Sequence, residues 1–251
     1  MASFPPLRPG SPAAAELLQR GTTWQLLGAI DGYSRPSGSG LATQAWNGRH
    51  LQVLEAAAEG AHRLRARLLD DGYPCWVETA DLLGRATAAP PPPPLLLDAV
   101  AIAQRRGAVM AFAEAALDQP NRYLWGGSLG PDYDCSGLVQ RAFASAGIWI
   151  PRDAYLQERF CQPVAVRPDV LHALQPGDLI FFGTPQRCTH VGLHLGNGRY
   201  LHSSGLEHGR NGLGIDDLSP RNGHPVASHY RRQLRGAGRV LRCLDGSPLP
   251  A

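Results

Sequence analysis

The chain has 251 residues, of which 43% are hydrophobic, and a formal net charge of +3 at neutral pH. This length accommodates one large domain or two small ones, each with a sizeable core. The arginines are dispersed and form no basic run, so the charge pattern gives no support to a nucleic-acid or membrane surface, and we expect neither partner.

The chain shows no sign of export or membrane insertion. No apolar run approaches the roughly 18 residues of a membrane span. The opening residues, MASFPPLRPGSPAAAELLQRG, lack the basic start, apolar core and cleavage site of a secretory signal. The five cysteines form no CxxC pair, and their odd number leaves at least one thiol unpaired. We therefore expect a cytoplasmic protein and no zinc knuckle.

Residues 1–88 contain short segments of strand-like alternation between turn signals, which predicts a small antiparallel β-barrel preceded by an N-terminal extension. A helix over residues 54–69 is the alternative, favoured by Ala and Arg, although Gly60 in its middle counts against it. Strands are predicted at 23–30, 41–46, 49–55 and 62–79, the last with a strand end at Asp71-Gly72, and a loop at 31–40.

The clearest internal boundary is the segment APPPPPLLL at residues 89–97. Five consecutive prolines hold an extended, semi-rigid conformation that cannot lie inside a helix or a central strand. We predict a linker here, followed by a second domain at residues 98–251. A stiff spacer also makes it possible for the two domains to share a site.

The second domain is expected to be an α+β domain, because helices precede a run of antiparallel strands. Apolar residues at helical spacing predict a helix over 97–117 that ends before Pro120, and a second helix over 136–146 closed by Gly147. Residues 175–182 predict a turn and a buried strand, and residues 190–204 predict a hairpin about Asn197-Gly198.

The most informative residue is Cys135, at the start of the second of these helices. Free backbone N–H groups and the positive end of the helix dipole stabilise a thiolate at this position. His190 opens the following hairpin and is the candidate base, and His202 is the candidate for orienting it. These three residues predict a cysteine hydrolase, in which the N–H of Cys135 also faces the developing oxyanion.

A strict two-residue turn would place His190 and His202 on opposite faces of the hairpin, because side chains alternate along a strand. A three-residue loop over 196–198 restores the parity and gathers apolar side chains on a core face. The two histidines are then several positions apart along the ribbon, so strand twist or a bulge must bring them together. The side chains expected on the core face are Val191, Leu193, Leu195 and Leu201.

The motifs YLWGG, DCSGLVQ, PRDA, QPGDLIFF and THVGLHLGNGRYLHSS, in this order, resemble the NlpC-type (p-sixty) peptidoglycan endopeptidases over roughly residues 98–245. This resemblance implies a papain-like fold with Cys135 as the nucleophile, His190 as the base and His202 as the orienting residue. It also implies that no metal or organic cofactor takes part.

The segments LATQAWNGRHLQVLE and DDGYPCWV resemble the bacterial Src-homology-3-like domain of cyanobacterial γ-D-glutamyl-L-diamino acid endopeptidases. The resemblance implies cleavage of the γ-D-Glu to diaminopimelate bond in peptidoglycan stem peptides that begin with a free L-Ala, during cell-wall recycling. In that subgroup a barrel tyrosine narrows the site, and Tyr73 matches its position. We expect the enzyme to be a monomer.

Four residues are candidates for substrate binding. Asp134 and Ser136 flank the nucleophile and, with Tyr73, form a plausible pocket for the free amine. By the resemblance, Tyr123 holds the oxyanion or the scissile carbonyl. A simpler role exists for each side chain: Asp134 is well placed to cap the helix, and Tyr123 would be a core aromatic in most chains.

Three other functions stay open at this point. The chain could be an inactive or wall-binding module, although the presence of all three catalytic candidates counts against that. It could act on intact peptidoglycan as a wall-remodelling hydrolase. It could also be a cysteine amidase or transferase with another acyl substrate, since a fold does not dictate its substrate.

Overall fold

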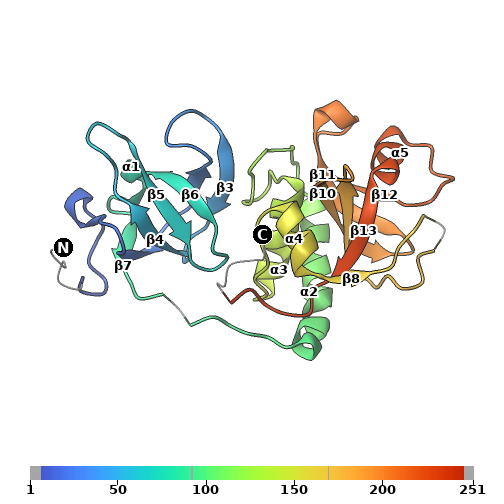
Figure 1. The fold of residues 1–251 in the computed structure, drawn as a ribbon, viewed down its shortest axis with the longest axis horizontal. Coiled ribbons are helices and arrows are strands. Elements are labelled where there is room, and N and C mark those ends of the chain that lie inside the picture. The colour runs from blue at the N-terminus through green and yellow to red at the C-terminus, as the bar shows by residue number, and fades with distance from the viewer. Residues whose placement is uncertain (1–6, 92, 169, 246–251) are drawn as a thin grey trace. The chain divides into compact units, whose positions relative to one another are not determined.

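The computed structural model describes residues 7–91, 93–168 and 170–245. The chain divides into two compact units, Met1–Pro94 and Leu95–Ala251 (Figure 1). The division lies inside the proline-rich segment 89–97. Among the described residues, no helix has the length and apolar character needed to cross a membrane.

The first unit is a β-structure whose strands form one antiparallel sheet in the order β3-β2-β6-β5-β4-β1-β7. Its core contains fully buried apolar side chains such as Trp24, Leu51 and Val77. The strands are β1 (Thr23–Leu26), β2 (Ile30–Tyr33), β3 (Leu41–Ala45), β4 (His50–Glu55), β5 (Arg63–Leu68), β6 (Pro74–Glu78) and β7 (Ala86–Ala88), with the short helices η1 (Ala15–Leu17) and α1 (Thr79–Leu82).

The structure corrects three details of this unit. The predicted strand 23–30 is two strands, because the chain bends after β1 at an exposed Leu27, and β2 runs on into the predicted loop as far as Tyr33. The alternative helix over 54–69 is wrong, since a turn with Gly60 at φ +76° separates β4 from β5. The predicted strand end at Asp71-Gly72 is three residues late, because β5 already ends at Leu68, but the chain does turn there, with Gly72 at φ +72°.

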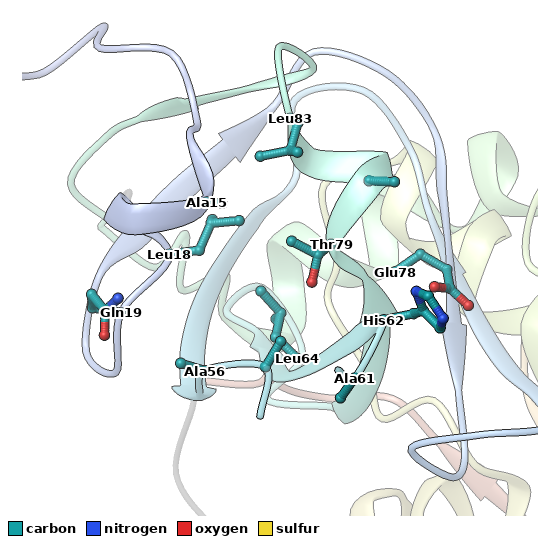
Figure 2. A pocket seen from close by; sticks show the side chains of 12 residues that line it. Ala15, Leu18, Gln19, Ala56, Ala61, His62, Leu64, Glu78, Thr79 and Leu83 are labelled. Atoms are coloured by element: carbon teal, nitrogen blue, oxygen red, sulfur yellow. The ribbon is translucent and has the colours of Figure 1, made fainter. Parts of the chain in front are cut away.

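A pocket of about 410 Å³ lies in this unit, lined mainly by alanine and leucine side chains (Figure 2). Its polar groups include His62, Thr79 and Glu78, and the carboxylate of Glu78 is paired with Arg63 at 2.7 Å. No cysteine lines it. None of the predicted catalytic residues Cys135, His190 and His202 lines it either, so it is not the predicted site.

The second unit confirms the α+β prediction: helices pack on an antiparallel sheet in the order β12-β11-β10-β9-β13-β8. Its helices are α2 (Ala99–Leu117), α3 (Cys135–Ser145), α4 (Ala154–Phe160), η2 (Leu206–His208) and α5 (Pro225–Arg232). Its strands are β8 (Gln162–Val164), β9 (Leu179–Gly183), β10 (Cys188–Gly196), β11 (Arg199–Ser204), β12 (Gly212–Asp217) and β13 (Leu234–Arg239).

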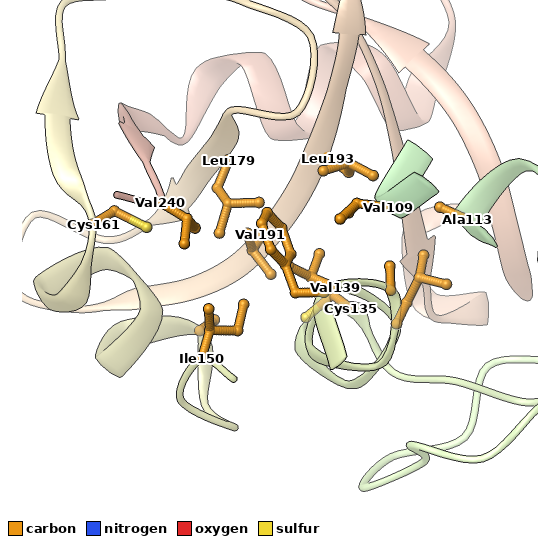
Figure 3. Close-up of a cluster of buried hydrophobic side chains, with 14 of the residues drawn as sticks. Val109, Ala113, Cys135, Val139, Ile150, Cys161, Leu179, Val191, Leu193 and Val240 are labelled. Atoms are coloured by element: carbon orange, nitrogen blue, oxygen red, sulfur yellow. The ribbon is translucent and has the colours of Figure 1, made fainter. Parts of the chain in front are cut away.

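Two apolar layers hold this sheet. One layer joins helices α2 and α3 to the sheet and contains Val139 and Val191, which Figure 3 shows among their neighbours. The other layer includes Phe182, Tyr200 and Tyr230, the last of which comes from α5. The sheet is therefore covered on both faces, and polar side chains that point into these layers are removed from water.

The two predicted helices are confirmed within two residues. Helix α2 begins after Asp98, whose carboxylate accepts a hydrogen bond from the N–H of Ala101 at 2.8 Å. Helix α3 begins at Cys135 and is closed by Gly147 at φ +75°. Capping by a short carboxylate at one end and a left-handed glycine at the other explains why these helices begin and end here.

The hairpin of β10 and β11 differs from the prediction in one respect. The connection is a two-residue turn, with Asn197 at φ 53° and Gly198 at φ 75°, and the register shifts between His194 and Gly196. A bulge at Leu195 therefore restores the parity that the three-residue loop was expected to restore. The expected core face is confirmed: Val191, Leu193, Leu195 and Leu201 all pack in one cluster.

Candidate active site

Cys135 is the first residue of helix α3 and is buried, with 7% of its surface exposed. The residue before it, Asp134, has extended backbone angles, so the chain enters the helix at the thiol. The backbone of Val191 forms a hydrogen bond with the Cys135 thiol. Strand β10 therefore reaches the nucleophile one residue after His190.

The imidazoles of His190 and His202 are joined directly, with 2.8 Å between His190 Nε2 and His202 Nδ1. The register of the hairpin explains this contact. Leu193 pairs with Leu201, so His202 lies across from Gly192, two positions from His190 on the same face. The bulge lies beyond this segment, toward the turn. The sequence analysis expected strand twist or a bulge to bring the two histidines together, whereas the structure shows that their diagonal pairing across the hairpin does so.

The chain of polar groups continues to Asp216 on strand β12. Its Oδ2 lies 2.8 Å from His202 Nε2 and 2.7 Å from Arg210 Nη2. A carboxylate only accepts hydrogen bonds, so His202 carries its proton on Nε2 and accepts at Nδ1. His190 then donates from Nε2, which leaves its Nδ1 as the free base.

Neighbouring groups hold this arrangement in place. The ring of Tyr230 stacks on His190, with 4.0 Å between the centroids and 19° between the planes. Arg210 reaches Asp216 across Gly214, where an added Cβ would lie 1.8 Å from the guanidinium. A side chain at position 214 would therefore displace the cation that pairs with the carboxylate.

Burial makes the resting groups neutral. It raises the pKa of Cys135 to about 12, with the charge of Asp134 as the next cause. It lowers the pKa of His190 well below its usual value, with the neighbouring His202 ring as the next cause. Burial also lowers the pKa of His202, against the opposing hydrogen bond to Asp216. A thiol and a neutral imidazole are the expected pair at pH 7.

This result corrects the prediction that the helix start stabilises a thiolate. The carboxylate of Asp134 accepts the N–H of Gly137 at 2.6 Å and so occupies a donor of the first turn. Its charge beside the thiol then opposes the dipole. The thiol must lose its proton during the reaction, and it needs the base for this step.

The predicted amine-binding residues Asp134 and Ser136 are both engaged by Arg152. Arg152 Nη2 lies 2.7 Å from Asp134 Oδ2, and Nη1 lies 3.0 Å from Oδ1 and 2.9 Å from Ser136 Oγ. Arg152 is almost fully buried, with 2% of its surface exposed. The capping role of Asp134 is present, and its role toward a substrate amine stays a prediction.

Tyr123 lines a cleft of about 320 Å³ together with His190 and Tyr230. Burial, followed by the charges of Cys135 and Asp134, raises the pKa of its phenol, which is therefore protonated and able to donate a hydrogen bond. The other residues lining the cleft are Trp125, Thr184, Thr189, Gly205, Glu207, His208, His229 and Gln233.

Tyr73 belongs to the first unit, where it is half-buried and packs against the core of that unit. Its backbone N–H donates to Asp71 Oδ1 at 3.1 Å. Its part in substrate selection stays a prediction. Within the described ranges, no three His, Cys, Asp or Glu side chains are arranged to hold a metal ion together.

Sequence reasoning missed Asp216, Arg210 and Arg152. The first two lie in GRNGLGIDD, a segment without a recognisable motif, and only the pairing of β12 with β11 brings them to His202. Arg152 is part of the PRDA motif that the resemblance quotes, but the motif gives no hint of its partner.

Comparison with known proteins gives two matches within this chain. Residues 120–233 match the family model described as "NlpC/P60 family", and residues 32–82 match the one described as "Bacterial dipeptidyl-peptidase Sh3 domain". The two matches fall in the second and the first unit, respectively.

Two curated relatives from Bacillus subtilis are similar to this chain. The bifunctional muramidase/DL-endopeptidase CwlT is 40% identical over 132 residues, which cover 51% of this chain and 35% of that protein. The gamma-D-glutamyl-L-lysine dipeptidyl-peptidase is 37% identical over 112 residues, covering 42% of this chain and 36% of that protein. The chain thus spans about a third of these relatives' length. A crystal structure of an NlpC/P60 family protein from Bacillus cereus is 24% identical, covers 88% of this chain and 64% of that one, and has a TM-score of 0.45.

Proposed function

Since this chain carries an NlpC/P60 domain together with a bacterial dipeptidyl-peptidase SH3 domain, we propose that it is a cysteine peptidase that acts on peptidoglycan stem peptides. The observation that carries this proposal is the hydrogen-bonded series His190, His202 and Asp216. The buried Cys135, at a helix start, is hydrogen-bonded to the backbone of Val191, the residue after His190. Nucleophile, base and orienting groups of a cysteine hydrolase are all provided.

We further propose that the scissile bond joins γ-D-glutamate to the diamino acid, in peptides that begin with a free L-alanine. The printed name of one relative, a gamma-D-glutamyl-L-lysine dipeptidyl-peptidase, supports this bond type. The SH3 match supports it too, because its description refers to a dipeptidyl-peptidase. Free amino ends arise when stem peptides are released from the wall, which fits a role in recycling within the cytoplasm.

In the proposed reaction, His190 Nδ1 takes the proton from the Cys135 thiol as sulfur attacks the γ-glutamyl carbonyl. The imidazolium is stabilised through His202 by the charge of Asp216. His190 then returns the proton to the leaving amine, and the C–N bond breaks to give a thioester. Water attacks the thioester with His190 again as base, and the acid product leaves the regenerated thiol.

The oxyanion formed in each attack requires hydrogen-bond donors. We assign this role to the backbone N–H of Cys135 and to the phenol of Tyr123, which stays protonated because burial raises its pKa. Preorganised donors at a developing oxyanion are typically among the largest single contributions to catalysis. Tyr123→Phe therefore tests the second donor separately from the nucleophile.

A second candidate is a wall-remodelling endopeptidase that cuts intact peptidoglycan. The 40% identity with the bifunctional muramidase/DL-endopeptidase CwlT favours it. The two candidates differ in whether a free amine is needed, so the choice between them is a matter of substrate discrimination and not of chemistry.

Mass-spectrometric product analysis separates the candidates. The enzyme is incubated with L-Ala-γ-D-Glu-diaminopimelate, with its N-acetylated form and with intact sacculi. Release of L-Ala-γ-D-Glu from the free tripeptide alone is expected, and Cys135→Ala should abolish it. Tyr73→Phe is expected to weaken discrimination against the acetylated peptide. Cleavage of sacculi would support the second candidate, and substantial activity of Cys135→Ala would exclude a cysteine peptidase.

A further inference from the structure

Three ionisable side chains of the cleft take no part in the proposed reaction: Glu207, His208 and His229. The imidazoles of His208 and His229 stack, with 4.3 Å between centroids and 21° between planes. Glu207 Oε1 lies 3.5 Å from His208 Nε2. Helix η2 supplies two of these residues and helix α5 the third, so the group combines two separate segments.

This group is held close to the base by one aromatic ring. Tyr230 stacks on His190, and it meets the His229 ring edge-on at 4.9 Å and the His208 ring edge-on at 5.7 Å. The amide Nε2 of Gln233 lies 3.3 Å from His229 Nε2, which fixes the plane of that ring. The pair is therefore a positioned part of the cleft and not a freely moving surface.

The charges of the group suit a ligand that carries both signs. Burial lowers the pKa of His229, and the charge of His208 is the next cause. The two rings therefore repel each other when both carry a proton. A carboxylate of the ligand accepts hydrogen bonds from both rings and offsets this repulsion. Glu207 has 67% of its side chain exposed and offers a carboxylate to an ammonium group.

A carboxylate and an ammonium on one carbon form the free end of an amino acid. The side chain of diaminopimelate ends in such a carbon, whereas the side chain of lysine ends in an ammonium alone. We propose that Glu207, His208 and His229 form a subsite for this end of the diamino acid and select diaminopimelate over lysine. The inference rests on the proposed function, because that function supplies a diamino acid as the leaving group.

The test measures binding without turnover, using isothermal titration of Cys135→Ala with L-Ala-γ-D-Glu-diaminopimelate and with L-Ala-γ-D-Glu-L-Lys. We expect the diaminopimelate peptide to bind more tightly. In the same Cys135→Ala background, His208→Phe together with His229→Phe keeps the ring stack but removes its hydrogen-bond donors. This double change should lower the ratio of affinities, diaminopimelate peptide over lysine peptide, roughly tenfold, which is the effect of one hydrogen bond to a charged group. His172→Gln, at an exposed histidine, is the matched control, and Glu207→Gln should weaken both peptides alike.

The subsite proposal would be refuted if Cys135→Ala bound the two peptides with equal affinity. It would also be refuted if the two phenylalanine substitutions changed the affinity ratio by less than twofold. Restoring an amide donor with His229→Gln should recover part of the ratio, which loss of packing alone would not do. Turnover by the unmodified enzyme is measured separately. If it cuts neither peptide, the proposed function fails, and the binding ratio still decides the subsite.

Discussion

Asp216→Asn tests whether the third member of the polar series acts on the reaction. The amide oxygen can still accept from His202 and Arg210, so the hydrogen bonds and the tautomers are kept while the negative charge is lost. In the reaction the proton moves to His190, whose ring lies 5.0 Å from that of His202, which is itself 2.8 Å from the carboxylate. The perturbation is therefore electrostatic.

The magnitude of this effect follows from the distances. At a separation of about 8 Å and an effective dielectric constant of about 20, the lost attraction is about 2 kcal/mol. Replacing a charged acceptor with a neutral one costs about 1 kcal/mol more. A total near 3 kcal/mol predicts a fall in kcat on the order of 100-fold.

The assay is steady-state cleavage of the tripeptide, together with a thermal unfolding curve for each variant. We expect kcat to fall and KM to change little, because the charge matters when the proton has moved. Asp217→Asn is the matched control: Asp217 follows on the same strand and holds a turn through Ser219 and Asn222. A kcat within threefold of the unmodified enzyme would refute the role of Asp216 in catalysis.

Three further predictions concern the site and its support. Alkylation of Cys135 by iodoacetamide should be slow at pH 7 and rise continuously to pH 9, because burial raises the pKa of the thiol to about 12; a plateau below pH 7 would show a preformed thiolate. Arg152→Met should lower the unfolding free energy by about 3–5 kcal/mol, since it leaves a buried carboxylate unpaired, whereas Arg159→Met at an exposed position should change it little in the same chemical denaturation series. Gly137→Ala should destabilise the protein by about 1–3 kcal/mol or more, because the added Cβ would lie 2.0 Å from a backbone carbonyl oxygen. Gly107→Ala, in open space on helix α2, should instead stabilise it by up to about 1 kcal/mol. Equal melting temperatures for the two variants would contradict the packing argument.

The elements with strong periodic signals could be predicted from the sequence. Helix α2 follows from its apolar spacing, although its start after Asp98 was predicted two residues too early, and the two-domain division follows from the proline run. The hairpin loop could not be settled, because a three-residue loop and a two-residue turn with a bulge give the same parity. Only the pairing in space, with its shift beyond His194, distinguishes them.

The thiol prediction failed for a related reason. A helix start indicates a lowered pKa when its N–H groups are free. The sequence already indicated Asp134 as a cap, and its carboxylate does occupy one of these N–H groups. The sequence does not show how completely the thiol is buried. Asp216 was missed because its role depends on the partner strand, where Asp216 pairs with Tyr200 and so lies diagonal to His202 on the same face.

The connection between β11 and β12 separates catalysis from specificity in this domain. The two strands keep one register from Arg199↔Asp217 to Ser204↔Gly212, and this register alone places Asp216 beside His202. The residues between the strands, 205–211, include Glu207 and His208 of the proposed subsite. Arg210, near the end of the connection, pairs with Asp216 and belongs to the catalytic support. Changes confined to residues 205–209 can therefore alter which diamino acid is bound without moving the catalytic pair, because the strands on either side and Arg210 fix that pair. A chimera that exchanges only residues 205–209 for those of a lysine-specific relative should change the preference between diaminopimelate and lysine by about tenfold, the effect of one hydrogen bond to a charged group. A loss of kcat on both peptides in that chimera would show that the connection and the catalytic pair are not independent.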